Sequence, residues 1–297
     1  MNFFKNLFTK DLFTRDLFSN TKCSICNKPV SEYYEISNEY FCPDCYSKYK
    51  MPRCVVCSKP IKDKAFCNSN GTTYCPDCEK QYPQCWHCNL PAKYIEFQDD
   101  DFILCQKCSK NTITKIEDLK ALYYKVKDYA KRACGINARI KKAVLLSSTE
   151  LKQQTQNNEA DSLGHRAMGF CKTIIYTNSG INEKQVHIIY VQNGMSYNMT
   201  FKTLAHEYGH AWEYQNKNKT LITQHPNSIF SEGFAEWVEY NTIKEFGLKE
   251  EAEKMIKIAK LNCHPIYGTG FKKMMKLEKK LGSKQALLEY VKNHNDF

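Results

Sequence analysis

Residues 23–45 read CSICNKPVSEYYEISNEYFCPDC, and the chain repeats this pattern twice more. The three opening pairs begin at Cys23, Cys54 and Cys85, which are 31 positions apart each time. Each opening reads Cys-x-x-Cys-Asn/Ser-x-Pro, and a closing Cys-x-x-Cys pair follows after 15, 17 and 16 residues. An aromatic or apolar stretch precedes each closing pair. One structural unit repeated three times explains this spacing best.

Two Cys-x-x-Cys pairs per unit are the ligand set of a structural zinc site. Four thiolates complete a tetrahedron and leave no open position. Each loop is too short to bury a core, so the metal should supply the folding free energy, on the order of 10 kcal/mol per site. We therefore predict three four-cysteine zinc modules over residues 23–110, each built from sequential pairs. A cross-brace pairing is the main alternative, and iron–sulfur ligation is another. The predicted ligands are Cys23, Cys26, Cys42 and Cys45 in the first module, Cys54, Cys57, Cys75 and Cys78 in the second, and Cys85, Cys88, Cys105 and Cys108 in the third.

The composition of the whole chain limits its class. Of 297 residues, 42% are hydrophobic, which is enough for a sizeable core. No apolar run approaches the ~20 residues needed to span a bilayer, and the first residues lack the apolar core of a signal peptide. These features argue against secreted, integral-membrane and wholly disordered proteins. Evenly spaced thiol pairs without a leader favour zinc in a reducing compartment, so we expect a cytoplasmic protein.

The positive charge is smaller than it first looks. The formal net charge is +11, but three zinc–thiolate sites would reduce it to about +5, and a fourth zinc on neutral histidines would return it to about +7. Acidic residues are interspersed, and no Lys/Arg block of five or more occurs. We therefore expect no nucleic-acid partner and no stable membrane insertion.

Residues 1–22 contain a five-residue repeat, with Leu7-Phe8, Leu12-Phe13 and Leu17-Phe18 as its apolar positions. A period of five fits neither a helix stripe nor a strand face. We interpret the segment as a partly ordered leader. The alternative is a docking segment for a partner or a membrane surface.

After Cys108 the pattern changes to that of an α+β domain over residues 111–297. Apolar residues at helical spacing predict a helix over 113–133. Three stretches, RIKKAVLLS at 139–147, CKTIIYT at 171–177 and VHIIYVQ at 186–192, predict strands. From Met199 onward the pattern is helical almost to the end. The fold class is therefore α+β, with an array of zinc modules followed by a domain of three strands and then helices.

One helix of this domain carries a second metal-binding pattern. Residues 201–215 read FKTLAHEYGHAWEYQ. Residues four apart share a helix face, so His206 and His210 can both bind one zinc, while Glu207 can reach a water bound there. Leu204, Ala205 and Ala211 on the same helix indicate burial.

A catalytic zinc needs a third protein ligand and an open position. The stretch SEGFAEWVEY begins 21 residues after His210 and supplies Glu232, which we predict as that ligand. Glu236 follows one turn later, and we predict that it orients a ligand imidazole without itself binding the metal. We expect Glu213 and Glu239 at the surface.

These motifs resemble a known family. His-Glu-x-x-His followed by Glu-Gly-Phe-Ala on a later helix resembles the gluzincin metallopeptidases. More specifically, IIYVQNG, LAHEYGHAW, SEGFAEW and PIYGTGF, with Gly169-Phe170-Cys171 upstream, resemble the DA-one-like peptidases. In that family a LIM-type zinc domain precedes a gluzincin-like zinc peptidase domain with an active-site helix pair. The resemblance spans roughly residues 23–297 and implies a cytoplasmic protease with protein substrates, some relatives being coupled to ubiquitin.

The chain departs from that family in its zinc modules. LIM domains join two modules by about two residues and usually include a histidine ligand. Here the linkers have eight and six residues, there are three modules, and every predicted ligand is a cysteine. The acidic ubiquitin-interacting helices of plant relatives are not visible, so the sequence leaves ubiquitin coupling open. A protein partner of the array remains an expectation.

The residue types predict four zincs per chain and a peptide-bond hydrolysis. Zinc would activate a water, Glu207 would act as general base, and a further donor would stabilise the oxyanion. Tyr267 is our candidate donor, with His165 and His264 as weaker ones. The edge of strand 186–192 could pair with a substrate backbone. The predicted activity is that of an endopeptidase targeted by the array. The alternative is a non-enzymatic scaffold for protein interactions.

Overall fold

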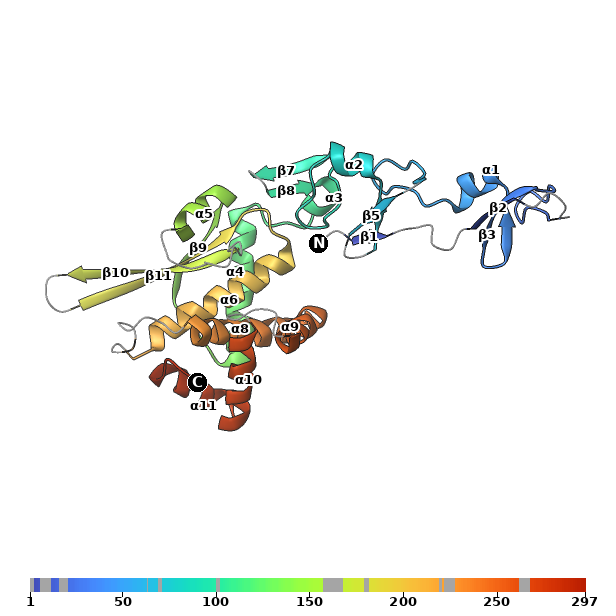
Figure 1. Ribbon diagram of the computed structural model, residues 1–297. Helices are drawn as coiled ribbons and strands as arrows, with labels where there is room; N and C mark the ends of the chain where they lie inside the picture. Colours follow the sequence, from blue (N-terminus) through green and yellow to red (C-terminus); the bar gives the residue numbers. More distant parts are fainter. Residues whose placement is uncertain are drawn as a thin grey trace. The chain divides into compact units, whose positions relative to one another are not determined.

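The computed structural model describes residues 3–5, 12–15, 21–62, 64–68, 71–99, 102–156, 168–178, 182–218, 221, 228–261 and 268–297. The chain divides into two compact units, Met1–Lys110 and Asn111–Phe297 (Figure 1). The first contains three cysteine modules, and the second contains a small sheet with helices. The α+β class is therefore confirmed.

Each module is a β-hairpin followed at once by a short helical turn. The first has β3 (Glu32–Ile36), β4 (Glu39–Phe41), α1 (Pro43–Cys45) and the π-helical turn η1 (Tyr46–Lys50). The second has β5 (Ala65–Cys67), β6 (Thr73–Tyr74) and α2 (Pro76–Gln81). The third has β7 (Ile95–Asp99), β8 (Phe102–Cys105) and α3 (Gln106–Ser109).

Local chemistry explains why the cysteine pairs adopt this shape. The residue after each opening pair lies in the left-handed region, with φ of 60° at Asn27, 60° at Ser58 and 54° at Asn89. Its N–H donates to the carbonyl of the first cysteine of the pair, four residues back. Asn tolerates this region better than most residues. Each closing pair begins with an extended cysteine that caps the helical turn. Both cysteines of every pair therefore point to one side of a tight turn.

The modules have very small apolar cores. The second buries Ile61, Ala65 and Tyr74, and the third buries Ala92, Phe102 and Leu104. A handful of side chains cannot offset the conformational entropy of ordering about 30 residues. Metal ligation is therefore the expected main source of stability in each module.

Two strands come from the repetitive segment at residues 1–22. β1 (Phe3–Lys5) pairs antiparallel with β5, and β2 (Leu12–Arg15) pairs antiparallel with β3. The sheets of the first unit are thus β2-β3-β4, β1-β5-β6 and the two-stranded β7-β8. A period of five did not indicate strands, but each strand here is only three or four residues long and needs no alternating pattern.

The second unit begins with α4 (Ile116–Cys134), β9 (Ile140–Leu146), α5 (Ser148–Gln156), β10 (Gly169–Asn178) and β11 (Asn182–Gln192). Its remaining helices are α6 (Tyr197–Asn216), α8 (Ser228–Phe246), α9 (Lys249–Leu261), α10 (Thr269–Leu281) and α11 (Lys284–Asn293). The strand order is β10-β11-β9, with β10 antiparallel and β9 parallel to β11. The strand predicted over 186–192 is therefore central, and the prediction that its edge is open was wrong. The sheet's edges are β9 and β10.

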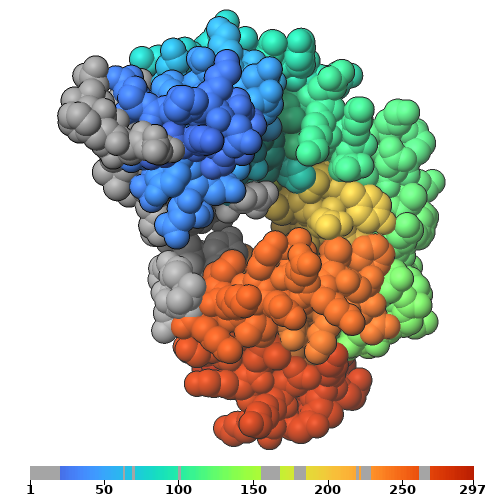
Figure 2. Space-filling view, turned by 90° about the vertical axis from the view of Figure 1, so that its right-hand side faces the viewer, coloured from blue at the N-terminus to red at the C-terminus, as the bar shows by residue number. Residues whose placement is uncertain are grey.

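Helices α4, α6 and α8 enclose the core of this unit. The core is built from large apolar side chains that are almost wholly buried, among them Leu119, Val126, Phe201, Tyr208, Phe234 and Trp237. Figure 2 shows this unit from one side, with the surface of α8 and α9 in orange and that of α10 and α11 in red. Within this core α6 and α8 pack side by side. These two helices carry the predicted ligands.

Helices α8 and α10 touch through their backbones at Gly233 and Gly270. A Cβ built on Gly233 would lie 2.4 Å from the carbonyl carbon of Gly270. A Cβ built on Gly270 would lie 2.3 Å from the carbonyl oxygen of Ile229. Neither helix can accept a side chain at this crossing. Because Gly233 follows Glu232 directly, the crossing also sets the position of a predicted metal ligand.

We predict that Gly270→Ala destabilises the second unit by at least about 2 kcal/mol. The added methyl group meets backbone, which cannot move aside as a flexible side chain would. Denaturant unfolding followed by tryptophan fluorescence measures the change. Lys276→Ala, at an exposed position of the same helix, is the control and should change stability by less than about 0.5 kcal/mol. Equal stability of the two variants would contradict the backbone contact.

Candidate metal centres

Two helices bring three ligand atoms together in the second unit. His206 and His210 lie one turn apart on α6, and Glu232 lies on α8. Nε2 of His206 is 3.2 Å from Nε2 of His210 and 3.1 Å from Oε2 of Glu232. Nε2 of His210 is 3.5 Å from Oε1 of Glu232. The edge of a tetrahedron around zinc with bonds of about 2.0–2.1 Å is ~3.3 Å, so the three side chains fit one zinc ion.

Close packing of α6 on α8 makes this convergence possible. A Cβ built on Gly209 would lie 3.1 Å from Cα of Ala235 and 3.2 Å from Cβ of Val238. A side chain at Gly209 would therefore hold the helices apart. Leu204, Ala205 and Tyr208 are fully buried on the same helix. Their packing fixes the position of the turn of α6 that carries His206 and His210.

The electrostatics of the cluster match a cation site. Burial disfavours a charged imidazole, yet Glu232 and Glu239 hold the pKa of His206 well above its usual range. Burial also opposes ionisation of Glu232, but His210 and His206 hold its pKa below the usual range. The cluster thus balances one buried negative charge with positive charge, and a dication can replace the protons in that role.

Glu207 lies beside the cluster and is only 7% exposed. Burial raises the pKa of its carboxyl, while His206 and His210 oppose that shift. The backbone N–H of Cys171 on β10 hydrogen-bonds the carboxylate. Glu207 is therefore held between α6 and the outer strand of the sheet. It is not one of the three ligands, and it is available for proton transfer.

The far nitrogens of both imidazoles are also engaged. Nδ1 of His206 is 3.4 Å from the Glu239 carboxylate, which Lys202 approaches to 3.5 Å. Nδ1 of His210 is 3.3 Å from the Ser231 hydroxyl, which donates to Glu213 at 2.6 Å. Since that hydroxyl proton goes to Glu213, the Ser231 oxygen accepts from Nδ1–H of His210. Both arrangements leave Nε2 free to bind a metal.

The structure corrects three carboxylate assignments. Glu236 does not contact a ligand imidazole, since its carboxylate accepts the N–H of Gly268 at 3.0 and 3.2 Å. Burial raises the pKa of Glu236 to about 7. Glu239 orients His206, and Glu213 acts on His210 through Ser231, although we expected both at the surface. A spacing of seven residues from Glu232 could have indicated Glu239, because two helical turns return to the same face.

Three other candidates lie outside the described residues: Tyr267, His165 and His264. Glu236 nevertheless holds Gly268, the residue that follows Tyr267, against α8.

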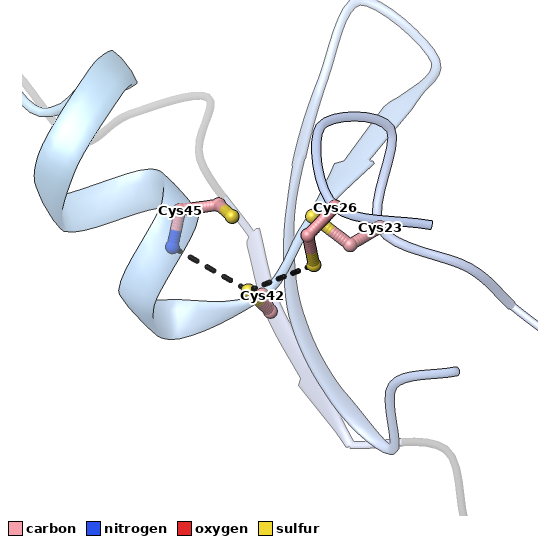
Figure 3. Close-up of side chains that lie close together, drawn as sticks. All are labelled: Cys23, Cys26, Cys42 and Cys45. Atoms are coloured by element: carbon pink, nitrogen blue, oxygen red, sulfur yellow. Dashed lines mark hydrogen bonds between the residues drawn. The ribbon is translucent and has the colours of Figure 1, made fainter. Parts of the chain in front are cut away.

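The cysteine modules show closed tetrahedral sites. Figure 3 shows Cys23, Cys26, Cys42 and Cys45 converging in the first module. Sγ atoms are 3.9 Å apart for Cys26 and Cys42, and the equivalent pairs Cys57–Cys75 and Cys88–Cys105 are 3.8 and 4.0 Å apart. In the second module the Sγ atoms of Cys54 and Cys78 are 3.7 Å apart. A zinc–sulfur bond of about 2.3 Å gives a tetrahedral edge of ~3.8 Å. The grouping follows the sequential pairs, so this prediction is confirmed and the cross-brace alternative is wrong.

Backbone N–H groups prepare these thiols for metal. Cys45 N–H points at Sγ of Cys42 and Cys105 N–H at Sγ of Cys85, both at 3.4 Å. The Cys88 thiol and nearby backbone N–H groups lower the pKa of Cys85 to about 4, although burial opposes this. The same contact with Cys85, together with burial, raises the pKa of Cys88, so the first proton leaves Cys85. A stabilised thiolate is the form that binds zinc. No described cysteine forms a disulfide. Three groups of four cysteines and one His-His-Glu group therefore make four candidate zinc sites, as predicted.

Comparisons with known proteins bear on the first unit. The chain is similar to human four and a half LIM domains protein 5, with 32% identity over 101 residues. The match covers 32% of this chain, its N-terminal third, and 34% of the human protein. The chain thus spans about a third of that relative's length. No family model matches the chain, and no solved structure matches it. The modules are LIM-like, and the comparison says nothing about the second unit.

No described helix is both long and apolar enough to cross a membrane.

We predict four zincs per chain, of which only the one at His206, His210 and Glu232 is readily removed. Its three protein ligands leave a coordination position open to a chelator, whereas four thiolates do not. Elemental analysis before and after treatment with 1,10-phenanthroline measures both numbers. The result should fall from four zincs to three. Two zincs or fewer at the start, or iron in place of zinc, would contradict the assignment of sites.

We predict that Glu239→Gln weakens zinc binding at the histidine site by roughly 10–100-fold, because a neutral amide orients the imidazole less well. Chelator competition measures the affinity. Glu236→Gln, one turn earlier on α8, is the matched control and should bind zinc as wild type does, since its contact is with Gly268. The reverse ranking of the two variants would show that Glu236 is the orienting carboxylate.

Proposed function

We propose that the second unit is a zinc-dependent endopeptidase and that the LIM-like array directs it to protein substrates. One observation carries the proposal: His206, His210 and Glu232 converge on one metal position with the buried Glu207 carboxylate beside them. Structural zinc sites use four protein ligands, whereas hydrolytic sites use three and keep a position open. The donor set and its neighbour are those of metal-assisted hydrolysis.

The residues divide the chemistry among them. When bound, zinc supplies Lewis acidity and lowers the pKa of a bound water towards ~7. Glu207 accepts the proton of the attacking water and returns it to the leaving amine. Glu239 and Ser231 keep the imidazoles oriented through their Nδ1 atoms. Tyr267 is the proposed donor to the oxyanion, and its loss should cost roughly 10²–10³ in turnover.

The outer strand of the sheet is the proposed place for the substrate backbone. β10 is an edge strand of the sheet formed by the described residues, and its Cys171 N–H reaches Glu207. An extended peptide added along β10 would pass next to the base. This replaces β11, which is paired on both sides.

The array supports a targeting role. Its four-cysteine sites have no open metal position, so they cannot carry out the hydrolysis. Its similarity to a human LIM protein favours protein recognition. We propose a cytoplasmic enzyme, since a reducing compartment keeps twelve paired thiols available for zinc.

The same similarity favours a second candidate, a scaffold in which the array binds a partner and the second unit only supports it. Catalysis separates the two. A scaffold needs no buried carboxylate beside a three-ligand metal site. Burial of the Glu207 carboxyl costs stability, and a base for hydrolysis is a function that accounts for that cost.

We predict that Glu207→Gln keeps four zincs and the fold but loses at least about 10²-fold in activity, because it removes only the base. Glu232→Ala should lose the zinc of the second unit and all activity. Zinc content and cleavage of an unfolded protein such as casein are measured on the same preparations. Glu250→Gln, at an exposed position of α9, is the control and should match wild type.

Two outcomes would overturn the proposal. The scaffold would be favoured if the wild-type protein binds four zincs but cuts no protein. In that case cells that express wild type and cells that express Glu207→Gln would also show the same cleaved termini. Full activity of Glu207→Gln would place the base elsewhere.

A further inference from the structure

The three module hairpins differ at their outer edges. In the first module β2 adds to β3, and in the second β1 adds to β5. Each addition is antiparallel and falls on the first strand of the hairpin. In the third module that position is the outer edge of β7, and β7-β8 is a two-stranded sheet in the part of the chain described here. The repeat therefore presents one kind of edge three times, and two of the three carry an added strand.

Both added strands carry the same short signature. Phenylalanine recurs at positions 3, 8, 13 and 18, and a basic residue follows two positions after the first three, as Lys5, Lys10 and Arg15. β1 contains Phe3 and Lys5, and β2 contains Phe13 and Arg15. A Phe-x-Lys/Arg segment is thus the partner of a module edge in both cases.

The charge on β3 and β7 suits this signature, whereas on β5 the register partner of Lys5 is Ala65. Arg15 is the register partner of Glu32, and β3 also contains Glu35. β7 carries Glu96 and Asp99 with the same spacing of three. Opposite charges in register across two strands stabilise the pair, while like charges oppose it.

The edge of β7 also exposes apolar surface. Tyr94, just before the strand, is 64% exposed, and Ile95 at its start is 43% exposed. Open strand edges with apolar residues are templates for an added strand. Backbone hydrogen bonds would supply affinity, and the acidic and apolar side chains would supply selectivity.

We propose that the outer edge of β7 is a docking site for an extended peptide of a partner protein that carries the Phe-x-Lys/Arg signature. The peptide adds antiparallel to β7, as residues 3–5 and 12–15 add to β5 and β3 within the chain. This inference is independent of the peptidase activity, because it uses only the first unit. The repetitive N-terminal segment indicates which residues the partner's peptide should contain.

The test uses the zinc-loaded full chain and a fluorescein-labelled peptide of residues 6–20, NLFTKDLFTRDLFSN. Fluorescence anisotropy should show saturable binding. Glu96→Lys should weaken it roughly 5-fold or more, because the basic residues then face a like charge. Asp77→Lys is the matched control: it reverses an exposed acid of the array that lies on α2 and not on a strand, and it should leave binding unchanged.

Backbone pairing is tested separately from charge. One form of the peptide is N-methylated at Leu12 and Thr14, and another at Phe13 and Arg15. Alternate N–H groups of a strand face its neighbour, so at least one form should lose binding although its side chains are unchanged. If both N-methylated forms bind as tightly as the unmodified peptide, or if Glu96→Lys binds the peptide as tightly as wild type, the β7 site is overturned.

Hydrogen exchange tests the occupancy of the other two edges. In a chain that lacks residues 1–20, the amides of residues 32–36 and 65–67 should exchange faster than in the full chain, while those of 95–99 should not change. If exchange at 32–36 and 65–67 is unchanged, the segment does not occupy those edges and the analogy with β7 fails.

Discussion

The contact between α6 and α8 is the constraint on which the second unit depends. At Gly209 the two helices approach so closely that an added Cβ would lie only 3.1 Å from Cα of Ala235. A bulkier residue would push α8 outward and carry Glu232 away from the histidines. On its other side α8 meets α10 at Gly233 and Gly270. A ligand at position 232 is thus held between two helix crossings, which limits its movement far more than a loop would.

The first unit is stabilised differently, because its described residues form no large apolar core. Each module buries only a few apolar side chains, so the hydrophobic effect contributes little and the four thiolates take its place. The two kinds of site in the chain therefore differ in purpose as well as in ligands. In the modules the metal makes the structure. In the second unit an apolar core stabilises the fold, with Phe201, Phe234 and Trp237 fully buried. The fold then positions the ligands of the metal site.

Burial explains the electrostatic design of the histidine site. The imidazoles and carboxylates are largely buried, with 15–23% of the three ligand side chains exposed. Water screens them poorly, so each charge needs a partner. Lys202 faces Glu239, and Lys217 faces Glu213, at the outer ends of the two chains that lead to His206 and His210. Each histidine is therefore supported by a carboxylate that is itself neutralised, and the charge of the cluster is left for the metal to balance.

Sequence alone determined the ligands, because metal ligation depends on local spacing. Two cysteines separated by two residues share a tight turn, and two histidines four apart share a helix face, whatever the rest of the chain does. The zinc modules and the histidine pair were predictable for that reason. Glu232 lies on a separate helix and was predictable only from the SEGFAEWVEY stretch. The three strands and the helices were predictable from residue type and periodicity. Only the tertiary structure decided the roles of Glu213, Ser231 and Glu239, the position of β11 inside the sheet, and the two strands formed by residues 3–5 and 12–15. These features depend on how helices cross and how distant segments pair. A residue can reach across such a contact from any position in the chain, so no spacing within the sequence encodes it.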